Sequence, residues 1–371
     1  MEVSIYTPES SARVFQHHIN QISGRTFNEW TYFHDSELFK GSARGKRIAC
    51  FQIPYPYNSS IEDEINDIYD SVDHILIIGS ELHSRTVEFI KKFDLSKITY
   101  FICGYLHWKM LNSSVLKFLD WFTTSVFFYK HIRPSILYEL KSFDAKPLMF
   151  DALLGRKKPH RDLAYNFMQE NNMLDKGVVT YLNDYKAVLT ETDSNRWMWE
   201  AKGIKDLGFQ IKNIEFTVDR VDYYGYNMSL SQIIPIDVYN QTAYSLVCET
   251  NFDNQFVFLT EKTVKPILAR RLFITLGNQY HLAALRRLGF RTFDGIIDES
   301  YDTMELYNER HLAALEQLKW LCEQDQAEIL EKVREIVDHN YNLMMTNDWY
   351  NLFRKDFGNF FFSTPNRIDE F

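Results

Sequence analysis

The chain has 371 residues, enough for two domains of ordinary size or one large one, and 45% of them are hydrophobic and 25% charged. This composition excludes a mini-protein and a disordered chain. Acidic residues outnumber basic ones by 50 to 41, and the resulting net charge of -9 argues against a protein held on nucleic acid or anionic lipid by its overall charge.

Cysteine spacing and the length of the apolar runs bear on the cellular context. The four cysteines stand singly and form no CxxC pair, so the sequence predicts neither a zinc site nor a disulfide framework. The first twenty residues lack the apolar core of a secretory signal, and no apolar run approaches the roughly 18 residues that span a bilayer. We therefore expect a cytoplasmic protein with no membrane span. A viral protein made in the host cytoplasm would also fit this expectation.

The first half of the chain alternates short apolar runs with helical or polar segments. Strands are expected at residues 2–7, 46–53, 74–81 and 97–106. Helices are expected at 59–72, where three isoleucines share one face, and at 84–94. Strands separated by such segments predict βαβ units and a parallel sheet. The first domain, residues 1–143, is therefore expected to be α/β.

The second half repeats the alternation after a polar break at residues 141–147. Strands are expected at 147–155, 177–182, 243–250, 256–260 and 271–277, with a helix at 280–289. A long helical pattern then covers 304–345, and an aromatic tail, 346–371, is expected to pack back on the first domain. The predicted fold is two Rossmann-like α/β domains with a helical C-terminal segment, and the second domain covers 144–345.

The most informative segment, Tyr244 to Asn278, reads as strand, polar loop, short strand and helix. Thr260 is the expected N-cap of that helix, whose first turn holds Glu261 and Lys262. A helix N-terminus after a strand favours an anion, and Lys262 adds positive charge. A carboxylate such as that of Glu261 can accept hydrogen bonds from ribose hydroxyls, so the pair suits a sugar nucleotide. The spacing is equally that of a surface ion pair between Glu261 and Lys265.

A basic turn follows the first strand of the second domain, in the run DALLGRKKPHRD from Asp151. Arginine can bind two phosphate oxygens at once, so Arg156 and Arg161 are candidates for contact with a nucleotide diphosphate. The alternative is a solvated basic turn on the surface.

The run GFRTFDGIIDESYD from Gly289 is rich in acids and hydroxyls. Its spacing fits no EF-hand, and we predict no metal site here. We expect instead that Asp298, Ser300 and Asp302 cap the helix that follows.

The run from Cys248 to Gly277 resembles the donor-binding segment of the α-1,3-fucosyltransferase family and its GT-B glycosyltransferase relatives. Phage and bacterial fucosyltransferase-like enzymes share the TEKT-K-P run, LGF-TF and DESYD, here at Thr260, Leu288 and Asp298. The likeness covers residues 244–302 and, more weakly, 147–162. The fucosyltransferases usually continue TEKLW where this chain has TEKTVKP, so the resemblance does not fix fucose as the sugar.

This resemblance implies roles for individual residues. Glu261 would hold the donor ribose and Lys262 the diphosphate, with Thr260 nearby. Glu249, in the preceding loop, is a further residue expected to contact the donor, and the first domain would bind the acceptor. In the basic turn, His160 and Arg161 are the better matches. The implied activity is direct, inverting, metal-independent transfer of a sugar from a UDP- or GDP-linked donor to a hydroxyl, with no further cofactor.

Such a transfer needs a general base for the acceptor hydroxyl, and in this architecture the base usually comes from the opposite domain. Ligands of open α/β sheets lie outside the carboxyl ends of the strands, which points to Glu81. The alternatives are His83, His107, Asp35 and Asp73.

The acceptor remains open between two classes. Basic clusters at residues 42–47, 155–161 and 268–271 would suit a hydroxymethylated cytosine in DNA, as in phage DNA-glucosylating enzymes, whereas the net charge favours a glycan. A non-catalytic sugar- or nucleotide-binding module would also explain the aromatic content. The chain contains neither GxGxxG nor GxxxxGK[ST], which counts against a dinucleotide oxidoreductase and a P-loop NTPase.

Overall fold

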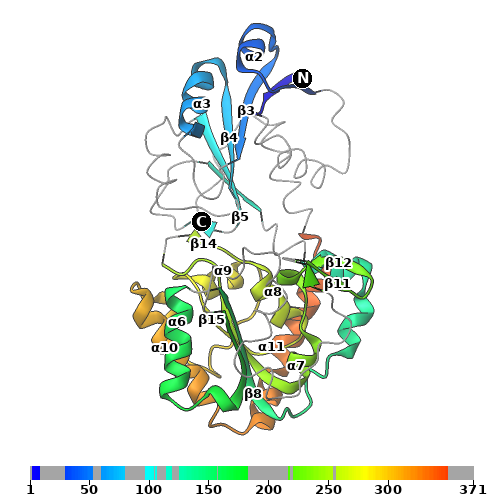
Figure 1. The fold of residues 1–371 in the computed structure, drawn as a ribbon, viewed down its shortest axis with the longest axis vertical. Coiled ribbons are helices and arrows are strands. Elements are labelled where there is room, and N and C mark those ends of the chain that lie inside the picture. Colours follow the sequence, from blue (N-terminus) through cyan, green and yellow to red (C-terminus); the bar gives the residue numbers. More distant parts are fainter. Residues whose placement is uncertain are drawn as a thin grey trace. The chain divides into compact units, whose positions relative to one another are not determined.

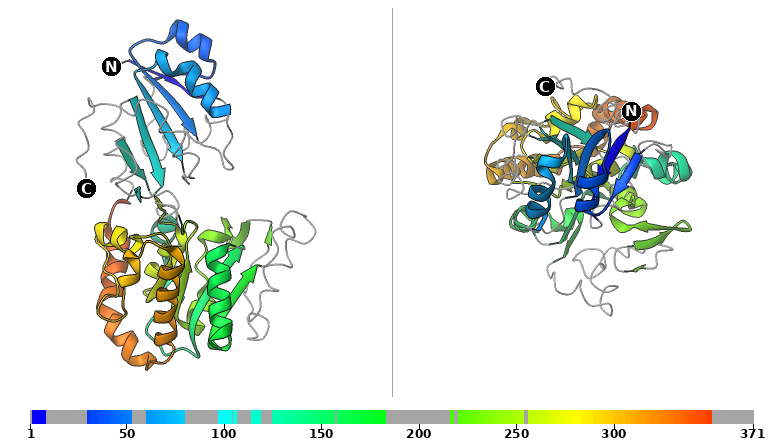
Figure 2. Two further views of the ribbon diagram at one scale, coloured as in Figure 1. Left: turned by 90° about the vertical axis from the view of Figure 1, so that its left-hand side faces the viewer. Right: turned by 90° about the horizontal axis from the view of Figure 1, so that it is seen from above.

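The computed structural model describes residues 2–8, 30–52, 60–79, 97–103, 105–106, 114–118, 125–156, 158–182, 216–217, 220–253 and 256–349. The chain forms two compact units, residues 1–120 with 348–371 and residues 121–347. Each unit is built on a parallel sheet (Figures 1 and 2), which confirms the predicted α/β class.

The first unit holds a six-stranded parallel sheet in the order β2-β1-β3-β4-β5-β7. Its elements are β1 (Val3–Tyr6), β2 (Trp30–Phe33), α2 (Ser36–Ser42), β3 (Lys46–Gln52), α3 (Ser60–Ile68), η1 (Tyr69–Ser71), β4 (His74–Gly79), β5 (Ile98–Cys103), β6 (Tyr105–Leu106) and β7 (Ser114–Phe118). The apolar stretches 48–51 and 75–78 are buried throughout, as expected for strands covered on both faces. The sequence patterns did not predict β2, α2 or β7, and the predicted helix at 84–94 lies outside the described residues.

The second unit is built on a four-stranded parallel sheet in the order β15-β13-β8-β9. Its strands are β8 (Leu148–Arg156), β9 (Gly177–Leu182), β10 (Phe216–Thr217), β11 (Arg220–Tyr223), β12 (Tyr226–Ser229), β13 (Thr242–Cys248), β14 (Phe256–Val257) and β15 (Phe273–Leu276). Strands β10, β11 and β12 form a separate antiparallel sheet.

The helices of this unit lie on both faces of its parallel sheet. They are η3 (Phe128–Ile132), η4 (Pro134–Glu139), α6 (Pro159–Glu170), η5 (Leu174–Lys176), η7 (Leu230–Gln232), α7 (Ile236–Gln241), α8 (Glu261–Leu268), α9 (His281–Arg287), η8 (Ser300–Thr303), α10 (Tyr307–Leu321) and α11 (Gln326–Thr346). Figure 1 shows α6 and α10 on one face and α8 and α11 on the other. The long helical pattern is two helices, because Asp325 accepts a hydrogen bond from Glu328 N and caps α11.

The strand order of the second unit fixes where a ligand would bind. The chain passes from β8 to β9 on one side, and then returns to place β13 and β15 on the other side of β8. The two crossovers leave β8 and β13 in opposite directions, so a topological switch point lies between the carboxyl ends of these strands. Residues 158–160 follow β8, and Glu249 follows β13.

A buried ion pair holds the half of this sheet that lies away from the switch point, near the amino ends of the strands. Arg271 Nη2 lies 2.8 Å from Asp151 Oδ1, and the guanidinium also donates to Thr242, Ser245 and the carbonyls of Tyr239 and Tyr244. Both side chains of the pair are nearly fully buried, with 2% and 4% exposure. Because every donor of Arg271 is used within the protein, we assign this pair a structural role.

Residues 125–143 belong to the second unit. Tyr129 OH accepts a hydrogen bond from Ile234 N at 2.6 Å, and Ser142 Oγ donates to Ala269 O at 2.8 Å. This unit therefore begins upstream of residue 144, which was the predicted start of the second domain. Of the tail, only residues 346–349 are described.

Candidate functional site

The first turn of α8 lies beside the switch point, and Thr260 caps it as predicted. Thr260 is extended, and its Oγ1 accepts a hydrogen bond from Lys262 N at 3.2 Å. The amide of Thr263 is bound to Thr260 O at 3.2 Å. These amides are already used, so the attraction of the turn for an anion comes mainly from the helix dipole and the charge of Lys262.

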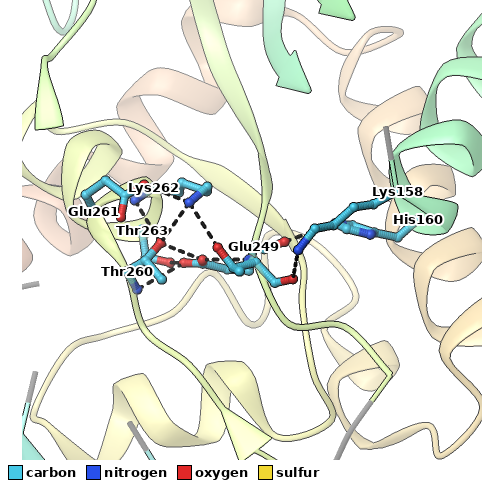
Figure 3. Close-up of polar contacts among 8 residues, drawn as sticks. Lys158, His160, Glu249, Thr260, Glu261, Lys262 and Thr263 are labelled. Atoms are coloured by element: carbon cyan, nitrogen blue, oxygen red, sulfur yellow. Dashed lines mark hydrogen bonds and ion pairs between the residues drawn. The ribbon is translucent and has the colours of Figure 1, made fainter. Parts of the chain in front are cut away.

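A buried carboxylate fixes this turn to the end of β13. Glu249 is 0% exposed, and its two oxygens accept hydrogen bonds from the hydroxyls of Thr260 and Thr263, both at 2.6 Å (Figure 3). The amides of Thr250 and Thr260 approach the same carboxylate at 3.3 Å. The predicted direct contact of Glu249 with a donor does not fit this burial. Glu249 instead positions α8, and we call this set of bonds the Glu249 clamp.

Glu261 and Lys262 form an ion pair at the site. Lys262 Nζ lies 2.7 Å from Glu261 Oε1 and 3.2 Å from Thr250 Oγ1 (Figure 3). The Glu261 side chain is 4% exposed and that of Lys262 29%, so Lys262 is the more accessible partner of the pair. Burial alone would raise the pKa of Glu261, but Lys262 and Lys265 outweigh it and lower the pKa. The Glu261 carboxyl group is therefore ionised. It forms its ion pair with Lys262, whereas the alternative prediction was a pair with Lys265.

The loop after β8 is tied to the loop after β13 by two side chains. Lys158 Nζ donates to Thr250 O at 2.8 Å, and His160 Nε2 lies 3.0 Å from Glu249 O (Figure 3). A carbonyl only accepts, so Nε2 of His160 carries the hydrogen. The His160 ring stacks on Phe252 at 4.3 Å and is 0% exposed. Together these contacts hold the two sides of the switch point at a fixed distance.

In the basic turn, His160 and Arg161 are buried and Lys158 is half-buried, whereas the alternative prediction was a solvated turn. Burial, helped by Arg161 nearby, lowers the pKa of His160 to about 2, so this histidine is neutral and supplies no charge to a phosphate. Arg161 is 6% exposed, and its guanidinium lies over Gly155, where a Cβ would approach Nη1 to 3.4 Å. Arg156 ends β8, and its side chain lies outside what the structure describes.

Two residues of α10 that the sequence did not indicate as part of the site hold the end of β15. Arg310 Nε and His311 Nε2, both from α10, lie 3.1 and 3.0 Å from Gly277 O, and Arg310 Nη2 donates to Phe252 O at 2.7 Å. Both residues are buried, and burial lowers the pKa of His311 to about 4. The available signal was an Arg-His pair beside the apolar stripe of α10.

The DESYD segment caps a different helix from the one predicted. Asp302 accepts hydrogen bonds from Leu282 N at 2.8 Å and Ala283 N at 2.9 Å, so it caps the preceding helix α9. Glu299 accepts from Phe293 N, Thr292 Oγ1 and Arg286 Nη1. Within the described residues, no three His, Cys, Asp or Glu side chains form a group that could hold a metal ion.

The catalytic residues expected in the first unit are only partly described. Glu81, His83 and His107 lie outside the described residues. Asp35 accepts from Leu38 N at 2.8 Å and caps α2. Asp73 accepts from Arg47 N at 2.8 Å at the amino end of β4, which removes it from the strand edge where a base is expected.

The chain matches no protein-family model, no curated protein and no solved structure. Among the helices that the structure describes, none has the length and apolar character to cross a membrane.

We predict that His160 makes the protein less stable in acid. An unfolded histidine takes up a proton near pH 6.5, whereas folded His160 stays neutral down to about pH 2. The contribution of His160 to stability is therefore present above pH 6.5 and is lost as the pH falls. Between about pH 7 and about pH 5, His160→Gln should lose about 2 kcal/mol less unfolding free energy than the wild type. Urea denaturation at both pH values measures this.

The control for this measurement is Ala164→Gly in the same helix, which should lower stability by about 1 kcal/mol at both pH values. An identical pH slope in His160→Gln and the wild type would contradict a neutral, buried His160.

The Glu249 clamp predicts a second stability effect. Glu249→Gln places an amide donor against groups that are themselves donors, so it should cost about 1 to 3 kcal/mol of unfolding free energy in urea denaturation. The matched control, Glu309→Gln at an exposed position of α10, should change stability by less than about 0.5 kcal/mol. Equal effects of the two substitutions would show that the clamp does not hold α8.

Proposed function

We propose that this chain is a GT-B-type glycosyltransferase whose second unit binds the nucleotide-sugar donor. The observation that carries the proposal is the ion pair of Glu261 and Lys262 on the first turn of α8, beside the switch point between β8 and β13. The residues that resemble the fucosyltransferase-like enzymes are the same ones that build this pair and the Glu249 clamp beneath it.

The pair suggests how a donor would be recognised. Lys262 is the more exposed partner, and its ammonium can turn from Glu261 to a diphosphate without a change in the backbone. That movement would uncover the carboxylate of Glu261, whose lowered pKa keeps it an acceptor for ribose hydroxyls. In the transfer step, the Lys262 charge and the α8 dipole would stabilise the departing diphosphate.

The remaining parts of the proposal rest on the sequence. Transfer would be inverting and metal-independent, with a UDP- or GDP-linked sugar as donor, Glu81 as general base and a glycan as acceptor. The protein would work in the cytoplasm. The rivals are a DNA glycosyltransferase acting on hydroxymethylcytosine and a non-catalytic binding module.

Donor binding is tested by thermal shift with UDP, GDP, CDP and dTDP and their sugars, because a ligand of the native state raises the melting temperature. One nucleotide class should shift the wild type. Lys262→Ala should weaken that binding by about 2 kcal/mol, the worth of a charge-assisted contact. The control Lys332→Ala, an exposed lysine on α11, should bind as the wild type does. No shift with any nucleotide would refute the proposed donor site.

The role of Glu261 is tested with two ligands. Glu261→Gln should weaken binding of the nucleoside diphosphate by about 1 to 2 kcal/mol, since a charged acceptor for the ribose is lost, and should spare inorganic pyrophosphate. Calorimetric titration with both ligands measures the difference. Equal losses would contradict the ribose assignment.

A further inference from the structure

A second surface on this unit is built from exposed tyrosines. Tyr138 is 85% exposed, Tyr224 42% and Tyr226 37%. They come from two separate segments, η4 and the β11–β12 hairpin. Figure 1 shows the hairpin beside the helical turns of residues 125–140. We call these three residues, with Glu139 and Arg133, the tyrosine surface.

Contacts between the two segments join and order this surface. Tyr224 OH donates to Glu139 Oε2 at 2.7 Å, and the Arg133 guanidinium lies over the Tyr226 ring at 5.4 Å. The hairpin that carries Tyr224 and Tyr226 is anchored by Tyr223, whose hydroxyl donates to Ile234 O at 3.0 Å. The rings of Tyr224 and Tyr226 are therefore held in place before any ligand arrives, which lowers the entropy lost on binding.

The hairpin holds Tyr224 in an unfavourable backbone conformation. Tyr223 pairs with Tyr226, so Tyr224 and Gly225 form a two-residue loop, and their φ angles are +52° and +82°. Such type I′ turns prefer Asn-Gly, and a bulky residue at positive φ is a rare outlier. The tyrosine gains no deep burial in return, since 42% of it is exposed. Strain kept at an exposed side chain points to a functional use of that side chain.

A rare helix type supplies the neighbouring residues. Residues 128–132 form a π-helix, whose buried Tyr129 anchors it to Ile234, and the exposed Arg133 follows directly. Single-turn π-helices are frequent at functional sites. Two uncommon backbone features, the π-helix and the left-handed Tyr224, thus lie under one surface.

The charges of the surface indicate a neutral ligand. Within residues 127–139 and 222–226, Lys130 and Arg133 are balanced by Glu139 and Asp222. Binding of a nucleic-acid strand relies on a positively charged groove beside the stacking rings, and this balance does not provide one. Tyrosine rings offer flat apolar faces with a polar edge, and the carboxylate and guanidinium beside them can bind hydroxyls.

We infer that the tyrosine surface binds a neutral oligosaccharide by stacking sugar rings on Tyr138, Tyr224 and Tyr226. This inference deepens the proposed function and rests on it, because the bound chain would be the acceptor glycan, anchored away from the sugar that receives the transfer. Glu139 and Arg133 would hold its hydroxyl groups.

The test begins with an array of neutral and acidic oligosaccharides, with oligo(dT) as a competing ligand. The wild type should retain neutral glycans, and the affinity for the strongest of them is then measured in the variants. Tyr138→Ala and Tyr224→Asn should each weaken it about tenfold, the loss typical of one stacking contact. Trp320→Ala should leave it unchanged, since Trp320 is an aromatic residue on α10 with 38% exposure, close to the 42% of Tyr224.

Tyr224→Asn separates binding from folding, because it gives the turn its preferred Asn-Gly sequence and should keep or raise the melting temperature. Retention of no glycan, preference for acidic glycans or oligo(dT), or full affinity in both tyrosine variants would overturn the inference. The nucleotide melting shift is recorded on the same samples. A tyrosine-dependent glycan signal without any nucleotide shift would support this surface while refuting the proposed donor site.

Discussion

The arrangement of the candidate site depends on one buried carboxylate. Glu249 follows β13 with no exposed surface, and the hydroxyls and amides of the α8 turn neutralise the cost of its burial. Because a buried acid without these donors would be strongly unfavourable, the clamp fixes the position of α8 relative to the sheet. Glu261 and Lys262 face the switch point as a consequence of that position.

The clamp is one part of a wider buried network at the carboxyl edge. The hydroxyl hydrogen of Thr263 goes to Glu249, so its oxygen can accept from His281 Nε2 at 3.3 Å, which connects the turn to α9. His160 reaches the backbone of Glu249 from the other side, and Arg310 and His311 hold the adjoining strand end. Neutral histidines and backbone carbonyls thus surround the site, and Lys262, whose side chain is 29% exposed, supplies positive charge there.

Sequence patterns predicted the parts of the structure that local physics decides. The long apolar runs gave β3, β4, β8 and β13, and the Thr-Glu-Lys order gave the N-cap of α8. The strands β2 and β7 were not predicted, because they have only four and five residues on which a strand pattern can be recognised. The charged residues were harder still. His160 and Arg161 look like a solvated turn, and only the stacking on Phe252 and the close approach to Gly155 show them as buried. Asp302 caps the helix before it because the chain folds back there, which no local rule reveals.

We propose that a nucleotide binds at the first turn of α8, which should slow backbone hydrogen exchange there. Hydrogen–deuterium exchange of the full chain, with and without the nucleoside diphosphate that raises its melting temperature, tests this directly. We expect slower exchange in the peptides that cover residues 249–263 and 158–161, and a smaller effect in Lys262→Ala at the same nucleotide concentration. Slower exchange confined to other segments, or unchanged protection in Lys262→Ala, would show that the nucleotide does not bind at this turn.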